Sequence, residues 1–177
     1  SNIDPRTTLL GQELPLPVVL APCGLVRIAG GDGEPSAVRA AGKAGLTYTI
    51  STASSWSIEE IAAHATGPLW FQLYMWPDRS LSHELVTRAK DAGYKALVVT
   101  VDGVHAGNRE YNIRNGFTIP FTFTPKNITD VLLHPRWMFG VLARYIVTTG
   151  MPRYQNYPTD VRARITAGPM GRSSLRT

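Results

Sequence analysis

Several polar side chains of this sequence stand at the ends of short apolar runs, where they could form a binding site. Ser51, Gln72 and Thr100 are uncharged hydrogen-bonding residues, suited to the carbonyl groups and ring nitrogens of a flat heterocycle. Tyr74 supplies a phenol, and Arg109 supplies a planar cation that can hold a carboxylate through two parallel hydrogen bonds. This set of residues predicts a cofactor ring and an acidic substrate.

Two further features extend the candidate site. Pro22, Cys23 and Gly24 form a tight turn in which main-chain groups can approach a ligand closely. Asp102 could orient and stabilise a positively charged partner, as the acid does in an Asp–His pair.

Each of these assignments has a plainer alternative. Ser51 and Thr100 could cap strand ends, Asp102 could cap a helix or turn, and Arg109 could be a surface arginine. His105 lies close by in the sequence and is a weak candidate for a catalytic base, because loop histidines are usually solvated. No metal site is predicted, since the other histidines show no metal-ligand spacing.

The elements that would position these residues follow a regular pattern. Four apolar runs predict buried strands at Pro17–Pro22, Thr47–Ser51, Leu69–Tyr74 and Ala96–Asp102. The three gaps between them predict helices from Glu34 to before Gly45, from Ser57 with a capping box at Glu60, and from Ser80 to Ala92. This alternation indicates a parallel sheet, either open and doubly wound or half of an eight-stranded barrel. Both architectures place function at the carboxyl ends of the strands.

Length and composition are those of an ordinary globular domain. The chain has 177 residues, 44% of them hydrophobic and 18% charged, which excludes a disordered protein. Its single cysteine, Cys23, excludes an internal disulfide and fits a reducing compartment. Neither a signal peptide nor an apolar run long enough to span a bilayer is recognisable.

Positive charge is concentrated at the C-terminal end. Residues 131–177 contain seven arginines, no lysine and one acid, Asp160, for a net charge of +6. The whole chain carries +5, so residues 1–130 carry −1. A basic tail can bind nucleic acid, an anionic membrane surface or an acidic partner. We predict no nucleic-acid binding, because charge is its only support and no recognition motif accompanies it.

Six segments of the sequence together resemble the FMN-dependent α-hydroxy-acid dehydrogenase family, which includes glycolate oxidase and the lactate and mandelate dehydrogenases. They are LPLPVVLAPCG, GEPSAVRAA, ISTASSWSIEE, WFQLY, GYKALVVTVD and GNREYNIRNGF, in order from about residue 8 to residue 125. The resemblance implies an α/β fold, the (β/α)₈ TIM barrel, of which this chain supplies roughly the first four βα units. It also implies FMN as the cofactor.

The resemblance gives each candidate residue a role. Main chain at Pro22, Cys23 and Gly24 would contact the flavin, and Ser51, Gln72 and Thr100 would hydrogen-bond its ring. Tyr74 and Arg109 would bind the substrate, and Asp102 would pair with a catalytic histidine. That histidine belongs to an SNHGGRQ segment that the 177 residues do not contain, so we expect this chain alone to be inactive. Ala53 stands where short-chain oxidases often have Trp, which favours a bulkier or aryl substrate.

The predicted function is FMN-dependent oxidation of an L-2-hydroxy acid, lactate- or mandelate-like, to the 2-oxo acid. The electrons would pass to quinone or another acceptor. One alternative is an oxidase of the same chemistry that uses oxygen. The other is a non-catalytic half-barrel binding module, which would apply if the chain truly ends at Thr177.

Two regions are expected. Residues 1–130 would form the N-terminal half of the FMN-binding barrel, and residues 131–177 a basic, apolar loop or helix segment after strand four. The stretch HPRWMFGVLARYIV is typical of a segment lying on a membrane surface, although a helix packed on the barrel or on another subunit is an equal alternative. We therefore predict a cytoplasmic protein, peripheral on the inner face of the cell membrane. Four strands with unpaired edges would also expose apolar surface, so we predict a homo-oligomer or pairing with the rest of a barrel.

Overall fold

A β-hairpin opens the chain. In the computed structural model, which describes residues 3–30, 32–101, 110–116, 124–150 and 153–157, strands β1 (Thr7–Leu9) and β2 (Gln12–Leu14) pair antiparallel. Leu10 and Gly11 join them with φ of 51° and 76°, the positive values of a tight hairpin turn. The indole N–H of Trp70 donates to Gln12 Oε1 at 2.8 Å. Trp70 lies near the start of its strand, so the hairpin lies at the amino ends of the parallel strands. The sequence patterns did not predict this hairpin.

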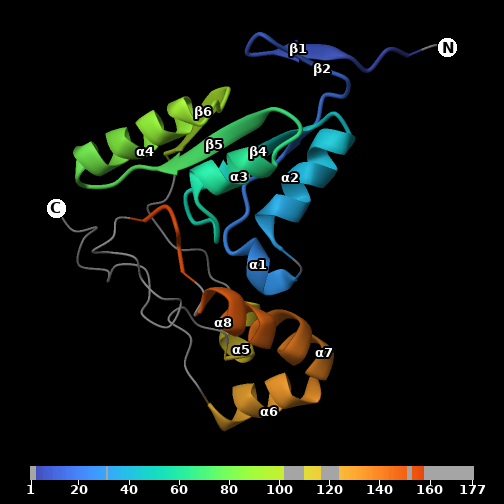
Figure 1. Cartoon of the computed structure of the whole chain (residues 1–177), viewed down its shortest axis with the longest axis vertical. Helices are drawn as coiled ribbons and strands as arrows, with labels where there is room; N and C mark the ends of the chain where they lie inside the picture. The colour runs from blue at the N-terminus through green and yellow to red at the C-terminus, as the bar shows by residue number, and fades with distance from the viewer. Residues whose placement is uncertain (1–2, 31, 102–109, 117–123, 151–152, 158–177) are drawn as a thin grey trace.

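Four parallel strands form the central sheet (Figure 1). They are β3 (Val19–Leu20), β4 (Thr47–Ser51), β5 (Leu69–Tyr74) and β6 (Ala96–Thr100), and each pairs with the next one along the chain. The order never reverses, which is the arrangement of a barrel segment; a doubly wound sheet has a switch point where the order reverses.

Three predicted helices connect the strands. They are α2 (Glu34–Lys43), α3 (Ile58–His64) and α4 (Arg79–Asp91). The predicted capping box of α3 is present: Glu60 N–H donates to Ser57 Oγ at 3.2 Å, and Ser57 N–H donates to Glu60 Oε2 at 3.0 Å. Gly93 follows α4 with φ of 85°, the left-handed conformation that ends many helices. A further short helix, α1 (Val26–Ala29), was not predicted.

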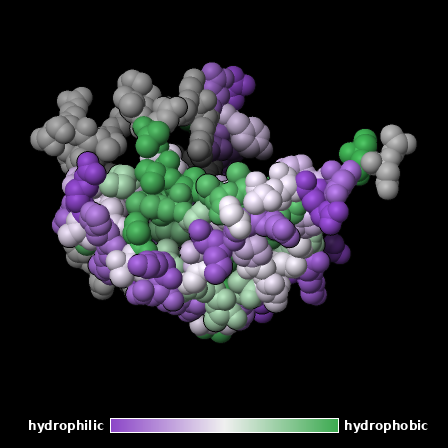
Figure 2. Space-filling view, turned by 90° about the horizontal axis from the view of Figure 1, so that it is seen from above, coloured by the Kyte–Doolittle hydropathy of each residue, from purple (hydrophilic) through white to green (hydrophobic). Residues whose placement is uncertain are grey.

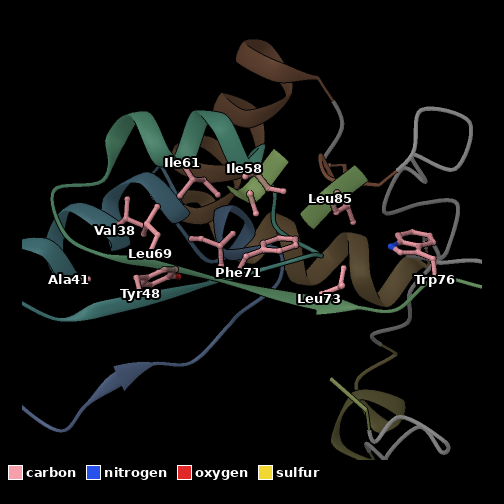
Figure 3. Close-up of a cluster of buried hydrophobic side chains, with 12 residues drawn as sticks. Val38, Ala41, Tyr48, Ile58, Ile61, Leu69, Phe71, Leu73, Trp76 and Leu85 are labelled. Atoms are coloured by element: carbon pink, nitrogen blue, oxygen red, sulfur yellow. The ribbon is translucent and has the colours of Figure 1, made fainter. Parts of the chain in front are cut away.

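The hydrophobic core fills the space between the sheet and these helices (Figure 3). Ile50 and Phe71 of the sheet are fully buried, as are Ile58 and Ile61 on the inner face of α3. Side chains spaced three residues apart on a helix share one face, so α3 presents a continuous apolar stripe to the strands. Most of the stability of such a short helix comes from this packing.

Strand β6 is an exposed edge. Leu97 and Val99 are each 42% exposed, whereas every residue of β4 is buried. No described strand pairs with the outer edge of β6. Figure 2 shows hydrophobic residues gathered over one area of the surface, in the region of β5 and β6. The exposed apolar surface expected of a half-barrel is therefore present.

A helical segment follows the sheet. It contains α5 (Glu110–Arg114), α6 (Pro125–Leu133), α7 (Pro135–Trp137), a π-helical turn η1 (Met138–Ala143) and α8 (Arg144–Thr149), the last three forming one continuous helical rod. Figure 1 shows this group on the side of the molecule away from the hairpin, next to α1. Trp137 Nε1 donates to Ile28 O at 2.9 Å and fixes the rod to α1. Within the described parts of the chain, no helix has the length and apolar character needed to cross a membrane.

Candidate active site

A line of hydrogen bonds joins the carboxyl ends of all four parallel strands. Leu25 N–H donates to Ala53 O at 3.1 Å, and Ala53 N–H donates to Ser51 Oγ at 3.1 Å. The Ser51 hydroxyl donates to Gln72 Oε1 at 3.1 Å, and Gln72 Nε2 donates to Thr100 Oγ1 at 2.8 Å. Ser51, Gln72 and Thr100, singled out from the sequence, therefore lie in direct contact.

Strand register explains this convergence. Ser51 pairs with Gln72 across β4 and β5, and Thr100 pairs with Tyr74 across β5 and β6. Thr52 N–H also approaches Gln72 Oε1, at 3.4 Å, so the oxygen of the carboxamide faces two donors. The amide nitrogen must then face Thr100, and the orientation of the buried Gln72 side chain is fixed.

The polar atoms at this edge keep hydrogen-bonding capacity for a ligand. Thr100 Oγ1 accepts from Gln72, which leaves its own O–H to donate, and Gln72 Nε2 has a second N–H. No acceptor for either donor lies in the part of the chain that the structure describes. Neutral donors in a row match the carbonyl oxygens and ring nitrogens of a flavin, so this donor set fits FMN.

The loop after β3 packs closely on the loop after β4. A Cβ atom at Gly24 would lie 3.1 Å from Ala53 O and 3.2 Å from Ala53 Cβ, so glycine allows the two backbones to meet. Pro22, Cys23 and Gly24 are all exposed. Their main-chain groups are thus accessible beside the line of hydrogen bonds.

Tyr74 ends β5 with a fixed backbone and an accessible ring. Its N–H donates to Thr52 Oγ1 at 3.2 Å, and that hydroxyl donates to Gln72 O at 2.6 Å. The residue is 50% exposed, so its phenol is accessible beside Thr100. The predicted Asp102 and Arg109, and the weaker candidate His105, lie outside the described residues.

Two buried polar residues near the site were missed by the sequence patterns. Glu34 Oε1 accepts a hydrogen bond of 2.8 Å from Ser55 N–H, whereas Glu34 Oε2 has no partner. Burial raises the pKa of the Glu34 carboxyl, and the hydrogen bond from Ser55 opposes this only in part. Asn156 is the second residue, and it binds the loop after β4. An acid at a helix start and an Asn in a loop are common, so neither carried a usable local signal.

Arg27 connects the helical rod to the loops of the site. Its guanidinium lies 4.8 Å from the ring centroid of Trp56 and 4.2 Å from that of Tyr145. Asp32 accepts from Arg144 and from Arg39, each at 3.4 Å. Burial raises the pKa of Tyr145, although the positive charge of Arg27 acts in the opposite direction. The rod is therefore packed against the elements that follow β3 and β4.

Within the ranges that the structure describes, no group of three or more His, Cys, Asp and Glu side chains is placed to hold a metal ion.

Comparison with protein families and curated proteins identifies clear relatives. The family model described as FMN-dependent dehydrogenase matches residues 1–170. The chain is 42% identical over 135 residues to a putative L-lactate dehydrogenase of Mycobacterium tuberculosis and 40% identical over 131 residues to glycolate oxidase of Spinacia oleracea. It is 38% identical over 152 residues to (S)-mandelate dehydrogenase of Pseudomonas putida. These matches cover 76%, 74% and 86% of the chain but only 33%, 36% and 37% of the relatives, so it spans about a third of their length.

Solved structures agree with these matches. The chain superposes on the crystal structure of the monotopic membrane protein (S)-mandelate dehydrogenase with a TM-score of 0.79 and 34% identity, over 92% of this chain and 42% of that one. Mandelate oxidase with (S)-2-phenylpropionate gives a TM-score of 0.62 and 41% identity, over 70% of this chain and 36% of that one. The predicted TIM-barrel fold is confirmed, with this chain supplying the N-terminal part of the barrel.

Proposed function

This chain belongs to the FMN-dependent dehydrogenase family, and we propose that the whole protein oxidises an L-2-hydroxy acid to the 2-oxo acid. The family confirms the predicted cofactor, FMN. One observation supports the function above others: the hydrogen bonds that run from Leu25 through Ala53, Ser51 and Gln72 to Thr100. They present neutral donors in a fixed arrangement at the edge of the sheet where barrel enzymes carry their active sites.

Each residue of this edge has a definite task in the proposal. Ser51, Gln72 and Thr100 would hydrogen-bond the flavin ring, and the exposed main chain from Pro22 through Cys23 to Gly24 would contact it. Bound FMN supplies a two-electron acceptor that amino-acid side chains lack. Rigid donors cost little to reorganise when a ligand binds, so the buried Gln72 amide favours tight binding.

In the proposal, the substrate binds to residues at the ends of the strands and in the loops that follow them. The phenol of Tyr74 and the guanidinium of Arg109 would bind the carboxylate end of the acid. Asp102 would stabilise the imidazolium of a catalytic histidine after it takes the substrate's proton. We propose that this histidine comes from polypeptide outside residues 1–177. The small side chain of Ala53 leaves room for an aryl group, which favours a mandelate-like substrate over a short one.

The exposed face of the helical segment supports attachment to a membrane surface. An enzyme at that surface would pass its electrons to a quinone in the membrane. Leu133 is 73% exposed and Phe139 is 66% exposed, and the arginines Arg136 and Arg144 lie in the same segment. Apolar side chains with nearby cations suit the interface of an anionic membrane. The similar (S)-mandelate dehydrogenase is, by its title, a monotopic membrane protein. We therefore propose peripheral attachment through residues 131–177, next to the flavin half of residues 1–130, with α6 beginning slightly earlier at Pro125.

An oxygen-using oxidase is the second candidate. Glycolate oxidase and mandelate oxidase are among the similar proteins. The reaction of the reduced flavin with oxygen separates the two, because an oxidase turns over in air without an added acceptor.

An absorption experiment on the intact protein, expressed from its complete reading frame, tests the proposal. We expect a visible flavin spectrum that bleaches when (S)-mandelate or L-lactate is added without oxygen. The (R)- and D-enantiomers are the controls and should leave the spectrum unchanged. A colourless protein that takes up no added FMN would refute the proposed function, and bleaching by L-lactate alone would refute the preference for an aryl substrate.

A further inference from the structure

We propose that Asn156 is a positioning residue for the loop after β4, residues 52–57, and thereby for the substrate side of the active site. This inference rests on the proposed function. Asn156 lies in the short described stretch 153–157, about 100 residues after the loop that it contacts, and it is only 1% exposed.

Both the oxygen and the nitrogen of the Asn156 carboxamide take part in this contact. Its Oδ1 accepts from Ile58 N–H at 3.0 Å, at the start of α3. Its Nδ2 donates to Ser54 Oγ at 3.2 Å and to Trp56 O at 3.3 Å. The amide oxygen of Asn156 faces an N–H group, and its amide nitrogen faces two oxygens, so an amide fits here. A carboxylate would instead place a second oxygen against the carbonyl oxygen of Trp56.

The loop is also held by its other contacts. Gln155 N–H donates to Ser54 O at 3.2 Å, and Ser54 N–H donates to Ser51 O at 3.1 Å. Glu34 binds Ser55 N–H from the side of α2. Ala53 lies between these contacts, with its N–H on Ser51 Oγ and its carbonyl on Leu25 N–H. A shift of Ser54 would therefore also displace the backbone of Ala53.

The same stretch also contacts the loop after β5. The rings of Tyr154 and Tyr157 stack with centroids 4.7 Å apart, and Tyr157 meets Trp76 edge-on at 4.7 Å. Trp76 follows Tyr74 by two residues. Residues 153–157 thus touch the loop that carries Ala53 and the loop that follows Tyr74, the two residues proposed to face the substrate.

Loss of the Asn156 amide should therefore change substrate choice as well as stability. Ser54 Oγ and Trp56 O would each lose the hydrogen bond from Asn156 and keep only the one that joins them to each other, so the loop could shift Ala53 relative to the flavin-binding residues. A bulky substrate depends on the space at Ala53 more than a short one does. A change that only lowered the folded fraction would reduce both activities equally and leave their ratio unchanged.

The test compares Asn156→Ala and Asn156→Asp with wild type in the intact protein. Asn156→Asp keeps an oxygen that accepts from Ile58 N–H but loses the N–H donors to Ser54 and Trp56. It is the variant to measure if Asn156→Ala does not fold. Gln12→Ala is the matched control, because Gln12 also uses a carboxamide but contacts the opposite end of the sheet. Backbone hydrogen exchange over residues 52–58 and the ratio of kcat/KM for (S)-mandelate and L-lactate are measured.

We expect exchange over residues 52–58 to rise about tenfold in both Asn156 variants, and the kcat/KM ratio to change by about threefold or more. The control should change neither. Unchanged exchange would show that Asn156 does not hold the loop, and faster exchange with an unchanged ratio would refute the positioning role. If wild-type protein binds no FMN, the proposed function fails together with the substrate part of this inference, and the exchange rates still decide whether Asn156 holds the loop.

Discussion

The carboxamide of Gln72 donates a hydrogen bond of 2.8 Å to the hydroxyl of Thr100, one strand away. Because Gln72 also accepts from Ser51 on the other side, a single buried side chain joins three neighbouring strand ends. Its orientation is set before any ligand arrives. This arrangement makes Gln72 the residue on which the donor set depends most.

Replacing Gln72 with Leu should therefore weaken FMN binding strongly. The change removes the acceptor for Ser51 and the donor to Thr100 while keeping a similar volume. We expect FMN affinity of the intact protein to fall by about tenfold to a hundredfold, since each unpaired buried polar group costs about 1–3 kcal/mol. Gln12→Leu, at the opposite end of the sheet, should leave the affinity unchanged. Equal FMN titrations for wild type and Gln72→Leu would contradict the assignment.

Local sequence patterns predicted those parts of the fold whose secondary structure depends mainly on residues close together in the sequence. The strands at 47–51 and 69–74 coincide with their apolar runs, and the Ser57–Glu60 capping box starts a helix as expected. β3 is limited to Val19–Leu20, within the predicted run of residues 17–22. Proline has no N–H for the ladder, so Pro17 and Pro22 limit the pairing.

Other parts depend on contacts that a local pattern does not contain. The hairpin turn uses Leu10 at positive φ, which is uncommon for a residue other than glycine, so no turn signal was visible. The donors Ser51, Gln72 and Thr100 were predictable because parallel strands end at the same edge. Asn156 was not, because its partners lie about 100 residues away and only the tertiary fold brings them together.

Two helix glycines should respond in opposite directions to alanine. A Cβ at Gly42 in α2 would lie 2.8 Å from the backbone nitrogen of Gly67, whereas a Cβ at Gly140 in η1 would have nothing within 4 Å. Gly42→Ala should lower the free energy of unfolding by about 1–3 kcal/mol because the helix must move. Gly140→Ala should raise it by about 0.5–1 kcal/mol through helix propensity. Urea unfolding of both variants measures this, and destabilisation of equal size would contradict the packing at Gly42.

Glu34 should make stability fall with rising pH. Burial raises its folded-state pKa above the ordinary value of 4.5, so between these two values the folded state keeps a proton that the unfolded state has lost. Its contribution is fully present below pH 4.5 and is lost as the pH rises through the folded pKa.

The variant Glu34→Gln isolates this contribution, because its amide oxygen can still accept from Ser55 N–H. We expect the wild-type free energy of unfolding, measured relative to that of the variant, to decline as the pH rises from 4.5 toward neutrality. Glu13→Gln on the exposed hairpin is the control for a surface carboxylate. A difference that stays constant over this pH range would be incompatible with a raised pKa.

The edge of β6 should make the 177-residue chain associate when it is expressed alone. Leu97, Val98 and Val99 are exposed on a strand without a described partner on its outer side. We expect light scattering to find oligomers, in line with the predicted homo-oligomer, and Val99→Lys to shift them toward monomer. Val147→Lys, on an equally apolar but helical site, is the control and should not produce this shift. A stable monomer of the unmodified chain would contradict the prediction.

The exposed face of the helical segment should bind anionic membranes. Leu133 and Phe139 carry most of their surface in contact with solvent, and Arg136 lies between them in the sequence. Burial of one such apolar side chain contributes about 1.5–3 kcal/mol. We therefore expect the double change Leu133→Glu and Phe139→Glu to lower affinity for phosphatidylglycerol vesicles by at least about tenfold, since it removes two apolar anchors and adds repulsion. Ile3→Glu, equally exposed but near the N-terminus, should bind as wild type does. Retained vesicle binding by the double variant would instead favour the alternative in which this segment packs on another subunit.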